Sequence, residues 1–378
     1  MPNPETASRF APFRFLFTPL VAAAIAFVLG CAIFAAYGRN PLSAYWVMFQ
    51  GAFGSGYLFS EVLVKTTPLV LTGLAVALAA RMLLWNIGCE GQYVLGCVFS
   101  TGFALYVAPN APAWLLMPGA VLAGALGGGL WALIPALLKV RFKVNEILVT
   151  LLLNYVAIQL MDQLYFSTWR DPEGRGFPGT AAIPKAAELP RFFGSRVHLV
   201  FFLALAAAVA IWFVLGRTRW GYKLRVIGQS PGAAKYAGFS VNRHTIAVLC
   251  ASGMLAGLAG VGEILGLQHR LQEGVSVGYG YAGIVVAFLG GLNPLGVVFS
   301  AFALAALMVG GEQLQSVLGL PASISLVLEA GLLFGYLTGS YLSGRKFLPK
   351  AASEPEPEPE PELEPEQDAI PPQGGEHA

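Results

Sequence analysis

Charged residues are scarce in this sequence: only 12% of its 378 residues are Asp, Glu, Lys or Arg, whereas 56% are hydrophobic. A soluble domain carries roughly a quarter charged residues, so this scarcity excludes an ordinary soluble globular fold. The four cysteines all lie in apolar segments without metal-ligand spacing, and we interpret them as small packing residues. No cluster of His, Asp or Glu has catalytic or metal-binding spacing, which argues against an intramembrane enzyme.

Two further patterns are missing. No lysine follows a glycine, so the chain has no G-x-x-x-x-G-K-[ST] phosphate-binding loop and cannot hydrolyse ATP by that route. We therefore expect no cofactor in this chain. The alternating strands of an outer-membrane barrel are absent as well. What the sequence does contain is a series of long apolar runs, which indicate α-helices that cross a bilayer.

The apolar runs are long enough to predict an all-α polytopic membrane protein with about ten transmembrane helices, some of them broken. The runs are 15–37, 66–84, 87–108, 113–138, 147–168, 197–216, 245–267, 281–292, 294–311 and 323–342. The eighth run is too short to cross alone. Arg9 and Arg14 precede the first run as in a signal peptide, but that run continues past Cys31 to Tyr37, so we interpret it as a retained helix.

The orientation follows from the side of the membrane that collects basic residues. If the N-terminus is cytoplasmic, that side holds 15 of the 23 basic residues, which predicts that both termini are cytoplasmic. They are Arg9, Arg14, Arg81, Lys139, Arg141, Lys143, Arg217, Arg219, Lys223, Arg225, Lys235, Arg243, Arg345, Lys346 and Lys350. The largest external loop is then 169–196 and the largest cytoplasmic loop 217–244.

This topology divides the chain into three parts. Residues 1–14 form a cytoplasmic N-terminal arm, and residues 15–342 form the transmembrane domain. Residues 343–378 contain the run EPEPEPEPELEPE at 354–366, an acidic segment interrupted by proline. Such a composition cannot bury a core, so we predict a disordered cytoplasmic tail.

The stretch WNIGCEGQ, residues 85–92, places polar side chains between two apolar runs. Asn86 stands where it can cap the following helix, and Glu90, four residues later, shares its face. One interpretation is a polar, closely packed helix start with Glu90 turned into the bundle. The other is the lining or gate of a translocation path, formed by Trp85, Asn86, Glu90 and Gln92, because ionisable residues at membrane depth are costly and commonly functional.

Three other polar residues lie at membrane depth. Asn154 and Glu263 each interrupt an apolar helix, and either hydrogen bonds between helices or a polar substrate path would account for them. Asn293 lies in AFLGGLNPLGVVF, residues 287–299, where two glycines and a proline break an apolar stretch. Broken segments at membrane depth line cavities or binding paths, so we include Asn293 among the pathway candidates.

Several motifs together resemble a known family. They are WNIGCEGQ, KVNEILVTLLLNYVA (143–157), NPLSAYWVMFQGAFGS (40–55) and GQSPGAAKYAGF (228–239). From about residue 38 to 342 the chain resembles the permease subunits of bacterial ABC importers in the branched-chain amino-acid/ribose permease superfamily, and is most similar to nucleoside and simple-sugar permeases. The resemblance implies a second, different permease subunit, cytoplasmic ABC ATPase subunits that hold ATP and Mg, and an extracytoplasmic solute-binding protein.

The resemblance also gives a role to residues 230–238, SPGAAKYAG, which we call the coupling segment. Pro231 suits the first position of a short helix. Ala233, Ala234 and Ala237 are expected on one face that presses into a groove of the ATPase, while Lys235 and Tyr236 project elsewhere. The full set of predicted coupling residues is Pro231, Ala233, Ala234, Tyr236, Ala237 and Gly238.

The function expected from this resemblance is ATP-driven import of a small polar solute across the bacterial inner membrane, with nucleosides first and simple sugars second. No nucleic acid is involved. An alternative of another class is an ion-coupled secondary transporter, in which Glu90 or Glu263 would bind a coupling proton.

Overall fold

The computed structural model describes residues 11–321 and 323–342, with side chains from Thr18 onward. Within these residues the secondary structure is helical apart from three isolated β-bridges. The elements are α2 Ala11–Ala36, α3 Pro41–Phe53, α4 Gly56–Ala80, α5 Cys89–Gly102, η1 Phe103–Val107, α6 Ala113–Phe142, α7 Glu146–Gln163, η2 Leu164–Thr168, η3 Lys185–Ala187, α8 Leu199–Arg217, α9 Arg219–Gln229, α10 Pro231–Tyr236, α11 Val241–Glu263, η4 Ile264–Gln268, α12 Tyr279–Leu289, α13 Pro294–Leu318 and α14 Ser323–Leu342.

Eight helices of the described residues are long and apolar enough to cross a membrane, and each coincides with one of the ten predicted runs. The other two runs correspond to shorter or more polar elements, so eight of the ten predicted spanning helices have a candidate span among the described residues. The third run holds α5 and η1. The first turn of α5 contains Glu90 and Gln92, so this run is more polar than the eight candidate spans. The eighth run holds α12, which has only 11 residues.

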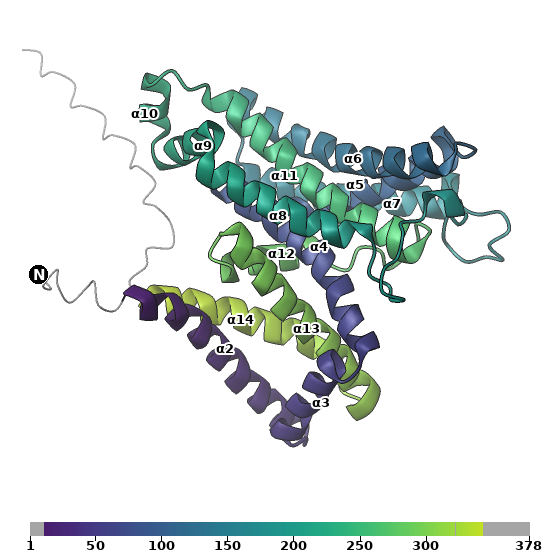
Figure 1. The fold of residues 1–378 in the computed structure, drawn as a ribbon, viewed down its shortest axis with the longest axis vertical. Helices are drawn as coiled ribbons and strands as arrows, with labels where there is room; N and C mark the ends of the chain where they lie inside the picture. Colours follow the sequence, from purple (N-terminus) through teal and green to yellow (C-terminus); the bar gives the residue numbers. More distant parts are fainter. Residues whose placement is uncertain (1–10, 322, 343–378) are drawn as a thin grey trace, which may run out of the picture. The chain divides into compact units, whose positions relative to one another are not determined.

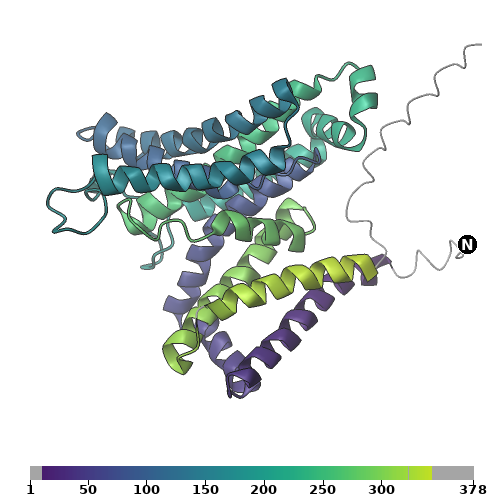
Figure 2. The ribbon, with the colours of Figure 1, turned by 180° about the vertical axis from the view of Figure 1, so that it is seen from behind.

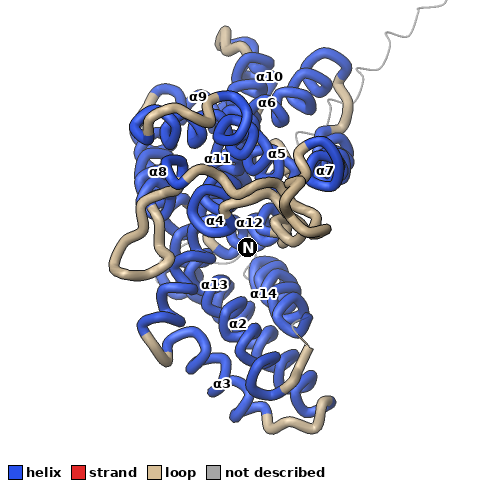
Figure 3. The backbone as a smooth tube through the Cα atoms, turned by 90° about the vertical axis from the view of Figure 1, so that its right-hand side faces the viewer, coloured by secondary structure: helices blue, strands red, loops and turns tan. Residues whose placement is uncertain are grey.

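Helix α4 is the central helix of the described unit. In its most apolar window 89% of the residues are buried, whereas the corresponding share for α8 is 22%. It packs against α11, α12, α13 and α8. Figure 1 shows α4 and α12 between a group formed by α5 to α11 and a second group formed by α2, α3, α13 and α14. The end-on view in Figure 3 shows the same order.

The first group owes its close packing to glycine. A Cβ on Gly96 of α5 would clash with the backbone of Gly257 in α11, and one on Gly128 of α6 would clash with Gly253 and Gly257. Small residues let membrane helices approach until their backbones touch, which increases van der Waals contact where no hydrophobic drive exists between helices. Helices α5, α6 and α11 therefore form a tight trio, and Figure 2 shows α6 alongside α7 on the far side of this group.

The break predicted at 287–299 is confirmed. Helix α12 ends at Leu289, and α13 begins at Pro294 with Asn293 as its cap. Between them Gly291 and Leu292 adopt positive φ angles of 64° and 56°. Glycine takes this conformation at little cost, whereas a leucine is held there only by its surroundings.

The helix starts differ from the prediction in two places. Helix α4 begins at Gly56, ten residues before the predicted run, because Glu61 and Lys65 interrupt the apolar pattern. Helix α3, over the motif at 40–55, was not predicted as a helix at all. Helix α2 begins at Ala11, whereas its candidate membrane span begins at Thr18. Residues 1–10 and the acidic tail 343–378 lie outside the described residues.

The loop 169–196 contains only one short helix, η3, among its described residues, and backbone hydrogen bonds hold it to the residues that follow α11. Thr180 N donates to Leu271 O at 2.9 Å, Ile183 N to His269 O at 2.9 Å, and Leu189 N to Leu265 O at 2.9 Å. These bonds satisfy polar backbone groups that would otherwise be buried without partners. The loop therefore closes over the end of α11 and η4.

Candidate functional site

Glu90, in the first turn of α5, is fully buried and bonded to the start of α12. Its Oε1 accepts from Ser276 Oγ at 2.6 Å and from Gly278 N at 3.0 Å, and its Oε2 accepts from Gly280 N at 2.6 Å. The first N–H groups of a helix have no partner inside it, and the helix dipole favours a negative group there. Helix α12 has no side-chain cap from its own sequence. Glu90 supplies that cap from another helix.

Asn86 and Gln92 form a reciprocal amide pair beside Glu90. Asn86 Nδ2 donates to Gln92 Oε1 at 2.8 Å, and Gln92 Nε2 donates to Asn86 Oδ1 at 2.9 Å. Asn86 Nδ2 also donates to Ser252 Oγ at 2.8 Å, and Ser252 in turn donates to Ala75 O at 2.7 Å. Both amides are buried, so their polar atoms are satisfied inside the protein, as buried polar groups require.

The predicted capping role of Asn86 was wrong. Helix α5 begins at Cys89, and its N-cap residue, Gly88, makes no side-chain capping bond. Asn86 lies three residues before the helix, where its Oδ1 accepts from Gly88 N at 3.1 Å. Asparagine readily forms such a local turn with the backbone two residues later.

Asn154 of α7 completes this polar group. Its Oδ1 accepts from Gly91 N at 2.8 Å, and its Nδ2 donates to Ile87 O at 2.9 Å and to Tyr281 Oη at 3.2 Å. The amide therefore joins α7 to the start of α5 and to α12. Four predicted residues, Asn86, Glu90, Gln92 and Asn154, thus lie around one short segment, 86–92. We call these four residues the polar frame.

The other three predicted pathway residues lie apart from the polar frame and share no hydrogen bond with it among the described residues. Trp85 is half-buried, with its ring centroid 5.7 Å from that of Phe288. Glu263, at the end of α11, accepts from Gln268 Nε2 at 3.0 Å. Asn293 donates no bond into the frame; its Oδ1 accepts from Leu295 N at 3.1 Å at the start of α13.

A group of charged residues at the start of α4 was missed. Lys65 Nζ lies 2.5 Å from Glu312 Oε1 of α13, and Arg196 Nη1 lies 3.0 Å from Glu61 Oε2. Glu61 and Lys65 are four residues apart, so they share a face of α4. We call Glu61, Lys65, Arg196 and Glu312 the α4 charge cluster. The i, i+4 pair of charges directly before an apolar run was the signal that could have revealed it.

Two more carboxylates interact electrostatically with Lys65. They are Glu263 and Glu329, and one carboxylate oxygen of Glu329 is buried without a hydrogen-bond partner. Lys65 has 18% of its side chain exposed, against 60% for Glu312. A mostly buried cation thus pairs with the exposed Glu312, and its charge also acts on two buried carboxylates. No group of three or more His, Cys, Asp or Glu side chains within the described residues could hold a metal ion.

The coupling segment contains the short helix that was predicted. Helix α10 spans Pro231–Tyr236, with Pro231 at its first turn and Ser230 Oγ accepting from Ala233 N at 3.3 Å. Residues Ala233, Ala237 and Gly238 are exposed, and Tyr236 is 97% exposed. The segment therefore offers a small-residue surface with one projecting aromatic ring.

The orientation predicted for Ala234 was wrong. Ala234 is fully buried within the chain, in a cluster that includes Leu224, Ile227 and Val248. Helix α9 packs behind α10, and α10 is anchored through the face that carries Ala234. Sequence spacing placed the three alanines together, but the fold assigns them to opposite sides.

Comparison with known proteins identifies the class of protein. A family model described as branched-chain amino acid transport system / permease component matches residues 58–337. The chain is 35% identical over 316 residues to a guanosine ABC transporter permease of Bacillus subtilis, which covers 82% of this chain and 89% of that relative. It is 35% identical over 337 residues to a glucose ABC transporter permease of Haloferax volcanii, covering 86% and 87%.

A third relative has a similar span. A nucleoside ABC transporter permease of Lactococcus lactis is 31% identical over 332 residues, covering 85% of this chain and 90% of the relative. These comparisons agree with the motifs at 85–92 and 228–239. They also agree with the eight candidate membrane spans among the described residues. The chain belongs to the family of branched-chain amino acid transport system permease components, and it is a multi-pass, non-catalytic ABC transporter permease of the nucleoside and sugar type.

Proposed function

We propose that this permease carries nucleosides into the cell as part of an ATP-driven importer. The observation that carries the proposal is the similarity over 82% of the chain to a guanosine permease, together with that to a nucleoside permease. Simple sugars are the second candidate, because a glucose permease is equally similar at 35% identity. Membership of an ABC permease family sets aside the ion-coupled transporter and the intramembrane enzyme.

The solute path is proposed to begin on the external side, at the α4 charge cluster. Its members Glu312 and Arg196 are partly exposed, so they can meet a solute, while Lys65 and Glu61 lie behind them. Hydroxyl and amide groups of a nucleoside or sugar form hydrogen bonds with carboxylates and cations of this kind. The polar frame has a different role in this proposal. Its polar atoms already bond to protein groups, so it holds α5, α7 and α12 in position along the path.

The partners are proposed from the family. ATPase subunits carrying ATP and Mg would bind the exposed surface of α10, a second and different permease would pair with this chain, and a solute-binding protein would deliver the solute from outside. This requires both termini and α10 on the cytoplasmic side. Cysteines introduced at Ser195 and Ser230 test the orientation: impermeant labelling from outside should modify only the first, and labelling of both from one side would refute it.

The substrate is tested by uptake in cells that produce this permease with its partner subunits. Labelled guanosine should accumulate, and unlabelled nucleosides in excess should suppress the signal while glucose leaves it unchanged. A strain lacking only this chain is the control. Accumulation of glucose in place of guanosine would replace the nucleoside assignment with the sugar one.

A further inference from the structure

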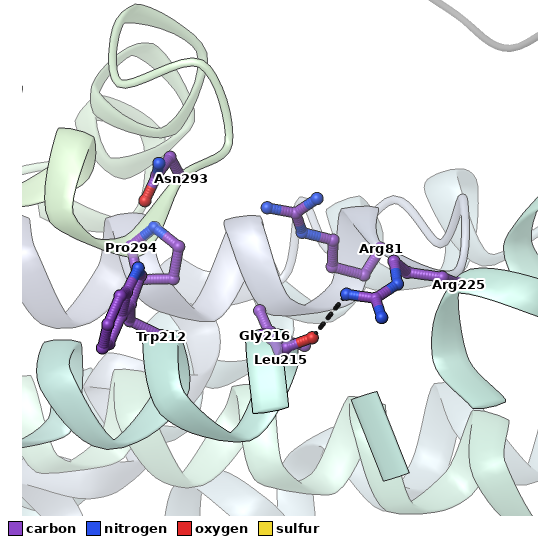
Figure 4. Close-up of a pocket in the computed structure, with 7 residues that line it drawn as sticks. All are labelled: Arg81, Trp212, Leu215, Gly216, Arg225, Asn293 and Pro294. Atoms are coloured by element: carbon purple, nitrogen blue, oxygen red, sulfur yellow. Dashed lines mark hydrogen bonds between the residues drawn. The ribbon is translucent and has the colours of Figure 1, made fainter. Parts of the chain in front are cut away.

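A pocket of about 170 Å³ opens where four segments of the chain meet, on the side that carries the basic loops. The end of α4, the end of α8, α9 and the junction of α12 with α13 each contribute to it. The lining residues are Arg81, Trp212, Leu215, Gly216, Arg225, Asn293 and Pro294, and we call this site the arginine pocket. Figure 4 shows both arginine side chains beside the end of α8, with Asn293 and Pro294 across the pocket.

Each guanidinium group is anchored by a single backbone carbonyl. Arg81 Nη2 donates to Leu292 O at 2.9 Å, and Arg225 Nη1 donates to Leu215 O at 2.7 Å. A guanidinium carries five N–H groups, so most of its donors remain for another partner. Arg81 Nε is buried and has no hydrogen-bond partner. Both guanidinium groups are therefore held in place while most of their N–H groups remain free to bind another group.

No carboxylate of the described residues balances these two charges. Neither Arg81 nor Arg225 takes part in an ion pair there. The sequence gives the reason, because the segments that hold the lining residues, 62–89, 189–262 and 274–311, contain no Asp or Glu. Burial, and then the positive charge of Arg225, lower the pKa of Arg81. Two like charges side by side repel, and an anion between them would remove that repulsion.

We propose that the arginine pocket binds a phosphate group, supplied by an anionic phospholipid of the adjacent leaflet. Planar guanidinium forks match phosphate oxygens and can bond them in pairs. The rest of the lining is apolar or amphipathic, with Leu215, Pro294 and a partly exposed Trp212, which suits the glycerol end of a lipid and the aromatic preference of the membrane interface. Basic pockets between membrane helices on the cytoplasmic side are typical sites for anionic headgroups.

A lipid in this position would connect two separate parts of the fold. Arg225 belongs to α9, which continues into α10 and the coupling segment, while Arg81 bonds to the break between α12 and α13. The bound phosphate would therefore link the proposed ATPase surface to the break that follows α12. The existence of the site does not depend on the nucleoside assignment, and the orientation proposed above only names the leaflet.

The test uses the purified full-length chain in a neutral detergent. Phosphatidylglycerol, phosphatidylcholine and inorganic phosphate are added separately to wild type, Arg225→Gln, Arg225→Lys and the control Arg219→Gln, whose exposed side chain is outside the pocket. Retained lipid is counted by native mass spectrometry, and the thermal midpoint is followed in parallel. Wild type and the control should retain phosphatidylglycerol and gain stability from it, phosphatidylcholine should have little effect, and Arg225→Gln should need at least tenfold more phosphatidylglycerol.

The remaining outcomes separate the sources of the phosphate. Arg225→Lys keeps the charge but loses the fork, so it should fall between wild type and Arg225→Gln. Stabilisation by inorganic phosphate alone, dependent on Arg225, would keep the phosphate site and change its source to a free anion. Equal retention of phosphatidylglycerol by wild type and Arg225→Gln, or equal retention of both lipids by wild type, would overturn the proposal. Arg225 is exposed, so its replacement should leave the fold intact, and the unliganded thermal midpoint verifies this.

Discussion

Replacement of Glu90 by alanine should destabilise the junction between α5 and α12. The change removes the acceptor of Ser276 Oγ, Gly278 N and Gly280 N. A buried donor left without a partner costs about 1–3 kcal/mol, and the serine hydroxyl can rotate to another acceptor. The two backbone donors therefore give a loss of about 2–6 kcal/mol, a large part of the 5–15 kcal/mol that typically separates folded and unfolded states.

The glutamine variant distinguishes two roles for Glu90: a structural role, in which it is a brace that joins α5 to α12, and a role in the solute path. Glu90→Gln keeps one acceptor oxygen for Ser276 and Gly278, but its amide would turn an N–H group toward Gly280 N, so we expect a loss of about 1–3 kcal/mol. If Glu90 is a brace, uptake should fall only in proportion to the amount of assembled transporter. Thermal midpoint, recovery of the complex and uptake per complex are the three measurements.

The control is Glu273→Gln, which changes an exposed carboxylate in the loop that also carries Ser276. It should leave all three quantities at the wild-type level. Glu90→Ala with wild-type stability would refute the assignment as a brace. A fully assembled Glu90→Gln transporter without uptake would instead place Glu90 on the solute path.

Three further outcomes are expected. Burial, and then the charges of Arg191 and His269, lower the pKa of His198 from 6.5 to about 4. As the pH falls, the unfolded chain therefore binds a proton at His198 before the folded chain does, and the free energy of unfolding should fall by about 2 kcal/mol between pH 7.5 and pH 5. Thermal melts of His198→Phe should not show this fall. Lys65→Met should cost roughly 2 kcal/mol because it removes a mostly buried cation whose charge acts on the buried Glu263 and Glu329. Glu312→Gln, at a 60% exposed group, should cost less than about 1 kcal/mol, and equal melting losses for the two variants would contradict this. Ala233→Glu should abolish co-purification of the ATPase with a folded permease, because the new charge would lack a partner in the groove of the ATPase. Ala234→Glu should instead lower the stability of the permease itself. Normal ATPase recovery with Ala233→Glu would place the docking surface elsewhere.

Patterns that depend on neighbouring residues were predictable from the sequence. Eight of the ten apolar runs coincide with candidate spans because helix formation in a bilayer needs only about 20 consecutive apolar residues. The break before Pro294 was also predictable, since glycine and proline act locally. Where a charge interrupted the apolar pattern, the predicted run started too late. Lys65 marks that point in α4, and its partner Glu312 lies 247 residues away.

Contacts between distant segments could not be read from the sequence. The bonds of Glu90 join residues 186 to 190 positions apart, and no local pattern names such partners. Ala233 and Ala234 illustrate the same limit on a smaller scale. They are neighbours with identical side chains, yet α9 covers one and leaves the other exposed. The arginine pocket likewise arises from four segments that only the fold brings together.

Uptake of labelled guanosine into proteoliposomes tests the central claim most directly. The permease is reconstituted with its partner permease and ATPase subunits, ATP is enclosed on the ATPase side, and the binding protein is added on the other. Guanosine should accumulate only when ATP and the binding protein are both present, and an agent that collapses ion gradients should not reduce it. Accumulation driven by an ion gradient without ATP, or uptake of glucose but not guanosine, would contradict a nucleoside ABC permease.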